Sequence, residues 1–200
     1  SGETSSYRSN PLGLAEFTLS RKDPNYVRLA KEIQEAEKAR EEQACPVQKF
    51  EELEAAWSVM KTITPDADRS NTGIGSTIFA VKPGDGSARE QAASCQKVLG
   101  GWANIANEYA TKRYRSNLIN WGMLPFLIKE GELPFKNLDY IYIPGIRRAV
   151  EEKTEVIKAY VVGSASGERK KTEFEMTLGE LTDEERQIIL KGCLINYNRV

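Results

Sequence analysis

The chain has 200 residues, enough for one domain of ordinary size or for one domain with a long appendage, and too few for two large domains. Lys plus Arg number 28 and Asp plus Glu 29, so the net charge is −1 and no basic excess is present to bind nucleic acid by counterion release. Histidine is absent, which excludes Ser-His-Asp and Cys-His nucleophile activation and histidine-ligated zinc. Any chemistry must therefore use Ser, Lys, Arg, Tyr or carboxylate side chains.

The three cysteines, Cys45, Cys95 and Cys193, form no Cys-x-x-Cys pair, and their odd number argues against a disulfide framework. We therefore expect a reducing, cytoplasmic setting. No apolar stretch approaches the roughly 18 residues that a membrane span needs, and no charged-then-apolar leader opens the chain. We expect neither a membrane nor a nucleic acid as a partner.

The N-terminal part of the chain predicts an irregular segment followed by two helices. Residues 1–20 mix turn formers and apolar residues without a clean period. Asp23-Pro24 is an N-cap followed by a first-turn proline, which predicts a helix to about Gln43. Its many charges and narrow apolar stripe predict an exposed arm, on the surface or against a partner. After Cys45-Pro46, apolar residues at spacings of three and four predict a second helix with a better buried face: Phe50, Leu53, Ala56, Trp57 and Met60.

The middle of the chain predicts a β-α-β unit. Residues 77–81 are a short apolar run of β-branched and aromatic residues, typical of an interior strand. A helical stripe begins at Ser87 and ends at Gly100-Gly101, after which residues 102–105 can form the next strand. Parallel strands joined by a right-handed crossover are the strong default for such a unit.

The C-terminal part predicts further helices and strands. A helix over residues 110–121 is stopped by Gly122, and residues 123–128 continue as extended chain with a proline. Three more strands are expected: residues 138–143, 155–162 and 171–176. Thr182 to Glu185 is a capping box that opens a final helix, with Gly192 as its stop. The pattern is that of an α/β fold with a parallel-containing sheet.

The stretch from Val81 to Glu90 is the most informative for function. A buried strand leads through Gly84, Gly86 and Ser87 to a helix start, where free backbone N–H groups and the positive end of a helix dipole can hold an anion. Arg89, in the first turn, can add a bidentate contact to a carboxylate or phosphate. From spacing alone the more common alternative is a plain glycine turn with Ser87 as helix cap. No nucleotide-binding Gly-x-Gly-x-x-Gly or P-loop sequence is present.

The remaining candidates have simpler interpretations. Arg8, taken alone, is typical of a surface residue in an irregular segment, and Arg147-Arg148 is typical of a solvated turn. The tryptophans predict core or interface positions. The cysteines lie near helical apolar faces or helix ends and predict small buried hydrophobic residues.

Four motifs in this order resemble the C-terminal swivelling domain of the aconitase family: residues 84–91, 99–103, 117–118 and 122–125. The likeness extends back to Tyr7-Arg8-Ser9-Asn10 and forward to residues 181–186, so that it covers most of the chain. The resemblance implies a single domain over residues 1–200, a three-layer swivelling β/β/α fold. The charged helical arm, residues 23–60, lies within it.

The resemblance also implies a hydro-lyase that removes and adds water on a di- or tricarboxylate. In the family the residue matching Ser87 acts as the base, and those matching Arg8 and Arg89 bind substrate carboxylates. We expect Gly86 and Ala88, in the same motif, to be substrate-binding residues as well. The family uses a 4Fe-4S cluster held by three cysteines on other domains, so neither cofactor nor metal is expected in this chain. Two residues depart from the family motif: Ala88 replaces its second serine and Gln91 its histidine, so the substrate need not be citrate.

The expected partners are the carboxylate substrate and the N-terminal, cluster-binding domains of the same protein, without which the chain should be inactive. A free-standing small subunit of an isopropylmalate-isomerase-type dehydratase is an alternative; the lack of the family's Thr-Asp-x-Ile-Ser stretch before Arg8 speaks against it. A non-enzymatic module that binds an anion or a partner's carboxylates at residues 84–89 is another. The third is a structural domain that docks through its charged arm.

Overall fold

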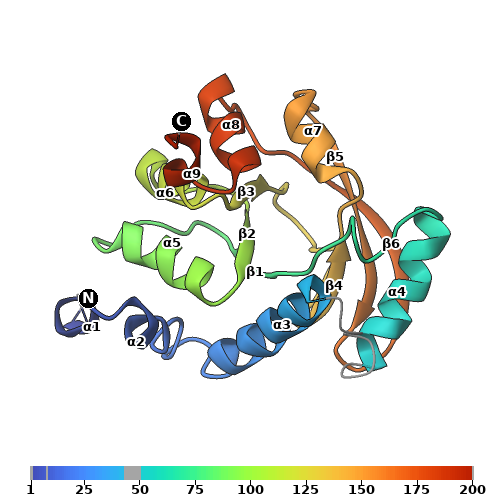
Figure 1. The fold of residues 1–200 in the computed structure, drawn as a ribbon, viewed down its shortest axis with the longest axis horizontal. Helices are drawn as coiled ribbons and strands as arrows, with labels where there is room; N and C mark the ends of the chain where they lie inside the picture. The colour runs from blue at the N-terminus through green and yellow to red at the C-terminus, as the bar shows by residue number, and fades with distance from the viewer. Residues whose placement is uncertain (1, 8, 43–50, 200) are drawn as a thin grey trace. The chain divides into compact units, whose positions relative to one another are not determined.

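The computed structural model describes residues 2–7, 9–42 and 51–199, and the chain divides into two compact units. Unit 1 comprises Ser1–Gln34, Gly75–Ile128 and Leu178–Val200, and unit 2 comprises Glu35–Ile74 and Lys129–Thr177. Each unit contains one three-stranded sheet with helices (Figure 1). The fold is α/β with both parallel and antiparallel pairing, and it has the mixed character that the sequence predicts for an aconitase-type domain.

The sheet of unit 1 consists of β1 (Ser76–Ala80), β2 (Gly101–Ala106) and β3 (Leu124–Leu127) in that order, with parallel pairing throughout. The central strand β2 carries the buried residues Ile105 and Ala106. Pro125 lies in β3, at the edge of the sheet, where its missing N–H costs least. The parallel pairing predicted for the first two strands is confirmed.

The helices of unit 1 largely follow the predicted stop and start signals. Helix α5 (Arg89–Val98) joins β1 to β2, and α6 (Lys112–Asn120) joins β2 to β3. Helix α8 (Asp183–Lys191) begins with the predicted capping box, in which Thr182 and Glu185 exchange side-chain and backbone hydrogen bonds. Helix α9 (Leu194–Tyr197) was not predicted, because its one short turn carries too little periodicity to detect.

The N-terminal segment is more regular than predicted. It forms α1 (Gly2–Ser6) and α2 (Pro11–Ala15), and α2 is stabilised by the side chain of Asn10, which accepts a hydrogen bond of 2.9 Å from Gly13 N. Asn at the N-cap followed by Pro in the first turn is a helix-start signal that the short length of the segment conceals.

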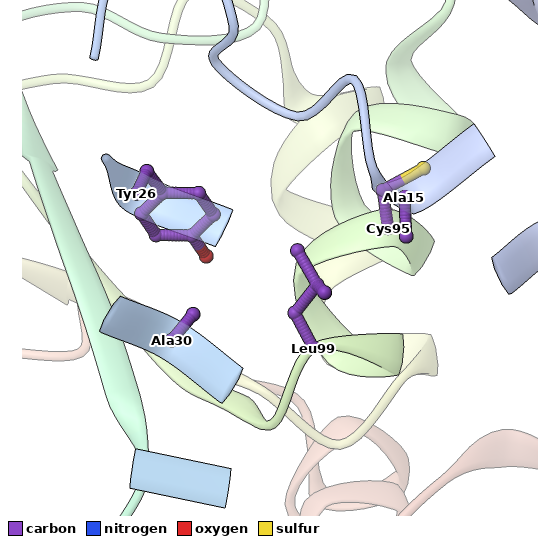
Figure 2. Packing of buried hydrophobic residues seen from close by; sticks show 5 residues of the cluster. All are labelled: Ala15, Tyr26, Ala30, Cys95 and Leu99. Carbon is purple, nitrogen blue, oxygen red and sulfur yellow. The ribbon is translucent and has the colours of Figure 1, made fainter. Parts of the chain in front are cut away.

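Helix α3 (Tyr26–Glu41) confirms the predicted long helix, but one of its faces is buried. Tyr26 and Ala30 pack in a cluster with Ala15 of α2, with Cys95 of α5 and with Leu99, the C-cap residue of α5 (Figure 2). The opposite face is charged and exposed, with an Arg28–Glu32 ion pair of 2.7 Å. The first turns of this helix therefore belong to the core of unit 1, and only its charged face matches the predicted exposed arm.

Unit 2 is an antiparallel sheet with α4 (Glu51–Ile63) packed against it. Its strands are β4 (Asp139–Tyr142), β5 (Ile157–Ser164) and β6 (Arg169–Met176), and the cluster of Ala56, Tyr142 and Val162 joins α4 to the sheet. Helix α7 (Ile146–Glu151) replaces the turn predicted at Arg147-Arg148. Both arginines pair with glutamates four residues later, at 3.7 and 2.8 Å, an arrangement that supports a helix.

Candidate functional site

The predicted anion site lies on the loop from Val81 to Ala88, which leads from the carboxyl end of β1 to the start of α5. Gly86 and Ser87 are exposed, and Ala88 and Arg89 are partly buried. The N-cap of α5 is Ala88, without a capping side-chain hydrogen bond, and the helix begins at Arg89, two residues later than predicted. Ser87 is thus not the N-cap residue.

Three hydrogen bonds fasten the first half of this loop to residues 108–111, which follow β2. Glu108 N donates to Val81 O at 3.1 Å, and Ala110 N donates to Pro83 O at 2.9 Å. The third bond runs from Thr111 Oγ1 to Gly84 O, also at 3.1 Å. The loop is therefore held as far as Gly84 and is exposed from Asp85 to Ser87.

The two glycines of the loop differ in what the fold requires of them. Gly84 has φ +99°, and a Cβ there would lie 2.4 Å from Tyr114 Cβ. Gly86 has no positive φ, and a Cβ there would meet nothing within 4 Å. The turn requires glycine at residue 84, whereas packing within the described structure permits a side chain at residue 86.

Beneath the loop, three buried side chains form a closed ring of hydrogen bonds. Tyr114 Oη donates to Asn104 Oδ1 at 2.7 Å, Asn104 Nδ2 donates to Gln96 Oε1 at 2.6 Å, and Gln96 Nε2 donates to Tyr114 Oη at 3.1 Å. The ring joins α6, β2 and α5, and burial raises the pKa of the Tyr114 hydroxyl above its ordinary value. Sequence reasoning missed this ring because a polar residue in a strand carries no sign of its distant partners.

The start of α5 offers unmatched donors. The first turn of a helix has N–H groups without an intrahelical acceptor, and Ala88 supplies no side chain to satisfy them. Arg89 Nε is buried and has no hydrogen-bond partner within the described part of the chain. The side chain of the next residue, Glu90, bonds elsewhere, because its Oε1 accepts a hydrogen bond of 3.0 Å from Trp121 Nε1. Helix N–H groups and a guanidinium are groups that bind anions in proteins, and here they follow Gly86 and Ser87 directly in the chain.

The remaining predicted site residue, Arg8, lies outside the described residues, as does Cys45. A pocket of about 190 Å³ beside α5 contains Glu90 and Trp121 together with Asn117, Asn120, Cys193, Leu194 and Ile195. Among residues 2–7, 9–42 and 51–199, no group of three His, Cys, Asp or Glu side chains could hold a metal ion. No helix in the same ranges is long and apolar enough to cross a membrane.

Comparison with models of known protein families identifies the family of this chain. Residues 27–131, more than half of the chain, match the model of the aconitase C-terminal domain. The chain belongs to this family. The matched region holds β1 to β3, α5 and α6 and thus the whole loop with Ser87 and Arg89, whereas Arg8 lies before it. Membership of the aconitase C-terminal domain family points to a hydro-lyase of the aconitase type.

The similar solved structures include the crystal structure of 3-isopropylmalate dehydratase (leuD) from Methanocaldococcus jannaschii DSM2661. It is 24% identical in sequence, the alignment covers 71% of this chain and 73% of that chain, and the TM-score is 0.42. A search of the curated proteins finds no match.

Proposed function

We propose that this chain is the swivelling C-terminal domain of an aconitase-like hydro-lyase and that its 84–89 loop acts on a di- or tricarboxylate. The observation that carries the proposal is the turn at the start of α5, in the family-matched region, where an uncapped helix N-terminus meets an arginine nitrogen without a partner among the described residues. In the proposal, residues 1–200 act as one domain that includes the arm over residues 23–60. It works in the cytoplasm against the N-terminal domains of the same protein.

Elimination of water from a hydroxy acid requires a base that removes a proton from carbon and groups that hold the carboxylates. In the proposal the Ser87 hydroxyl, exposed on the loop, is that base in its alkoxide form. An alkoxide needs a preorganised positive environment, which the N–H groups of the first turn of α5 and the guanidinium of Arg89 provide in part. Arg89 and Arg8 bind the substrate carboxylates, and Gly86, with its open Cβ position, lets the substrate approach the backbone.

Ala88 and Gln91 shape the substrate requirement. Ala88 replaces a serine of the family motif and Gln91 a histidine, so one hydrogen-bond donor near the substrate is missing. In the proposal the substrate is therefore a carboxylate that needs fewer hydrogen bonds at this position than citrate does.

The iron–sulfur cluster of the proposal belongs to the partner domains, because the described cysteines do not suit it. Cys95 is buried in the core of unit 1, and burial raises the pKa of its thiol, which disfavours the thiolate that binds iron. Cys193 is the N-cap residue of α9, in a different part of the sequence. When bound, such a cluster supplies a Lewis acid for the departing hydroxide, and the residues of this chain hold substrate and move the carbon-bound proton.

The deciding experiment uses the full-length protein with its cluster intact, checked by visible absorbance. Ser87→Ala should lower kcat by several orders of magnitude while substrate binding holds, and Arg89→Lys should chiefly raise KM through loss of the bidentate contact. The 200-residue chain alone should show no turnover of cis-aconitate. A Ser87→Ala enzyme that keeps more than about a tenth of wild-type kcat, a loss under about 1.4 kcal/mol of transition-state stabilisation, would end the assignment.

Two alternatives give other outcomes. An anion-binding module without enzymatic activity would bind carboxylates at residues 84–89, yet the full-length protein would show no turnover. A free-standing small subunit of an isopropylmalate-isomerase-type dehydratase would use Ser87 and Arg89 in the same roles. The upstream reading frame separates that form from the domain of a longer chain, because only the longer chain continues into cluster-binding domains.

A further inference from the structure

Thr111 makes two hydrogen bonds with one hydroxyl, and each serves a different element. It is the N-cap of α6, where Oγ1 accepts a hydrogen bond of 3.2 Å from Tyr114 N. The same oxygen donates to Gly84 O at 3.1 Å. A hydroxyl carries one hydrogen, so the donated bond goes to the loop and a lone pair serves the helix.

The hydrogen bond from Thr111 is made at Gly84, the residue at which the loop turns. Gly84 has φ +99°, and the chain after it is exposed as far as Ser87. The ring of Tyr114 lies against the Cα of the same glycine, since a Cβ there would meet Tyr114 Cβ, Cγ and Cδ1 at 2.4 to 2.6 Å. Thr111 thus fixes the carbonyl of Gly84 while Tyr114 supports its Cα, and the orientation of that peptide sets the course of the residues that follow.

The other fastenings of the loop lie earlier in the chain. The bonds to Val81 O and Pro83 O come from backbone N–H groups. The ion pair of Lys82 with Glu108, at 2.9 Å, joins two side chains that are more than half exposed and contributes little. The bond from Thr111 is a side-chain hydrogen bond to Gly84, the last residue before the exposed segment, and substitution can remove it without touching Ser87 or Arg89.

We propose that Thr111 is a positioning residue that holds the 84–89 loop in the geometry required for carboxylate binding. The inference rests on the function proposed above. Thr111 acts through Gly84 and Tyr114 rather than through the substrate, so its loss should alter the conformation of the loop and weaken binding although Ser87 and Arg89 are themselves unchanged.

The test compares variants of the 200-residue chain, labelled with ¹⁵N and titrated with citrate. Thr111→Val has nearly the same shape and loses both bonds, and Thr111→Ser keeps both. Thr182→Val is the matched control, since Thr182 likewise accepts a hydrogen bond, of 3.1 Å, at the N-cap of α8 in the same unit. We expect Thr111→Val to shift the amide resonances of residues 84–89 and to weaken citrate binding by about fivefold, the change that loss of one hydrogen bond produces. Thr111→Ser should match the wild type, and Thr182→Val should lower the melting temperature similarly while leaving loop and affinity unchanged.

Thr111→Asp keeps the proposal testable if the valine variant does not fold. Aspartate caps a helix well but has no hydrogen for Gly84 O near neutral pH. Its ligand-free loop should show lower heteronuclear NOE values at residues 85–88 than the wild type. Wild-type loop resonances and affinity in Thr111→Val, an unchanged NOE in Thr111→Asp, or equal effects of Thr182→Val would each overturn the inference. If the wild-type chain binds no citrate at this loop, the anion site has been misplaced, and the ligand-free spectra still decide whether Thr111 positions the loop.

Discussion

The two glycines of the loop provide a paired test of the site. Gly84→Ala and Gly86→Ala add the same methyl group two residues apart, in one loop. At Gly84 the new Cβ would lie 2.4 Å from Tyr114 Cβ, an atom next to the helix backbone that a change of side-chain rotamer does not move away. At Gly86 the new Cβ would enter open space.

The two substitutions should change the free energy of unfolding in opposite directions. A non-glycine residue at positive φ costs about 1–2 kcal/mol, and an added methyl in a packed position costs about 1–3 kcal/mol more. Gly84→Ala should therefore destabilise unit 1 by about 2–5 kcal/mol. Gly86→Ala, where φ is not positive and the added Cβ meets nothing, should stabilise it by up to about 1 kcal/mol because the unfolded chain loses conformational freedom.

Urea unfolding checks these values, with fluorescence followed in a Trp57→Phe background so that the signal comes from Trp102 and Trp121 of unit 1. With an m-value of about 2 kcal/mol/M, Gly84→Ala should lower the midpoint by about 1–2.5 M. A citrate titration by NMR then asks whether Gly86→Ala, although fully folded, binds more weakly than the wild type. An unchanged midpoint for Gly84→Ala would refute the loop geometry, and wild-type affinity in Gly86→Ala would refute the approach of the substrate at that glycine.

Two further outcomes follow from buried groups. Tyr114→Phe should destabilise the chain by about 1–3 kcal/mol in urea unfolding, because Asn104 Oδ1 loses its buried donor, and a midpoint equal to the wild type would contradict the hydrogen-bonded ring. Burial raises the pKa of Tyr26 from 10.0 to about 12, so the folded state retains the proton longer than the unfolded state. The stability from Tyr26 is fully present below pH 10 and is lost as the pH rises to about 12. Tyrosinate absorbance and circular dichroism followed together should show Tyr26 ionising with unfolding, and a Tyr26→Phe variant should lose that part of the alkaline transition.

The sequence predicted those parts of the fold that short-range patterns specify. The apolar run at residues 77–81, the helical stripe after it and the glycine stop at Gly100-Gly101 predicted two parallel strands and their connecting helix, and these are confirmed. The capping box at Thr182 was equally local and equally sound. The helix at residues 146–151 was missed because Pro144-Gly145 indicates a turn, although Ile146 and Val150 already have helical spacing.

Other features depend on residues far apart in the chain, and no local pattern reveals them. Unit 1 is assembled from three separate segments and unit 2 from two, so the boundary between the units crosses the chain at several places and is not marked by one linker in the sequence. The ring of Gln96, Asn104 and Tyr114 joins a helix, a strand and a second helix, and each residue alone is an ordinary polar side chain. The burial of Tyr26 against Ala15 and Leu99 similarly depends on how three helices meet, and a narrow stripe on one helix does not show it.

The motif at residues 84–89 shows how the requirements of folding and of binding can be separated. In the sequence Gly84 and Gly86 are equivalent, since both belong to one short glycine-rich turn. The structure distinguishes them through Tyr114, thirty residues beyond Gly84, whose ring excludes a side chain at the first position and not at the second. Gly84 is therefore explained by the fold, and nothing in the described fold explains Gly86. Gly86 is exposed and lies beside unmatched helix N–H groups and Arg89. A glycine loses more conformational entropy on folding than any other residue, and no packing contact at this position offsets that loss. The close approach of a ligand to the backbone is the physical reason that the proposed function supplies for it.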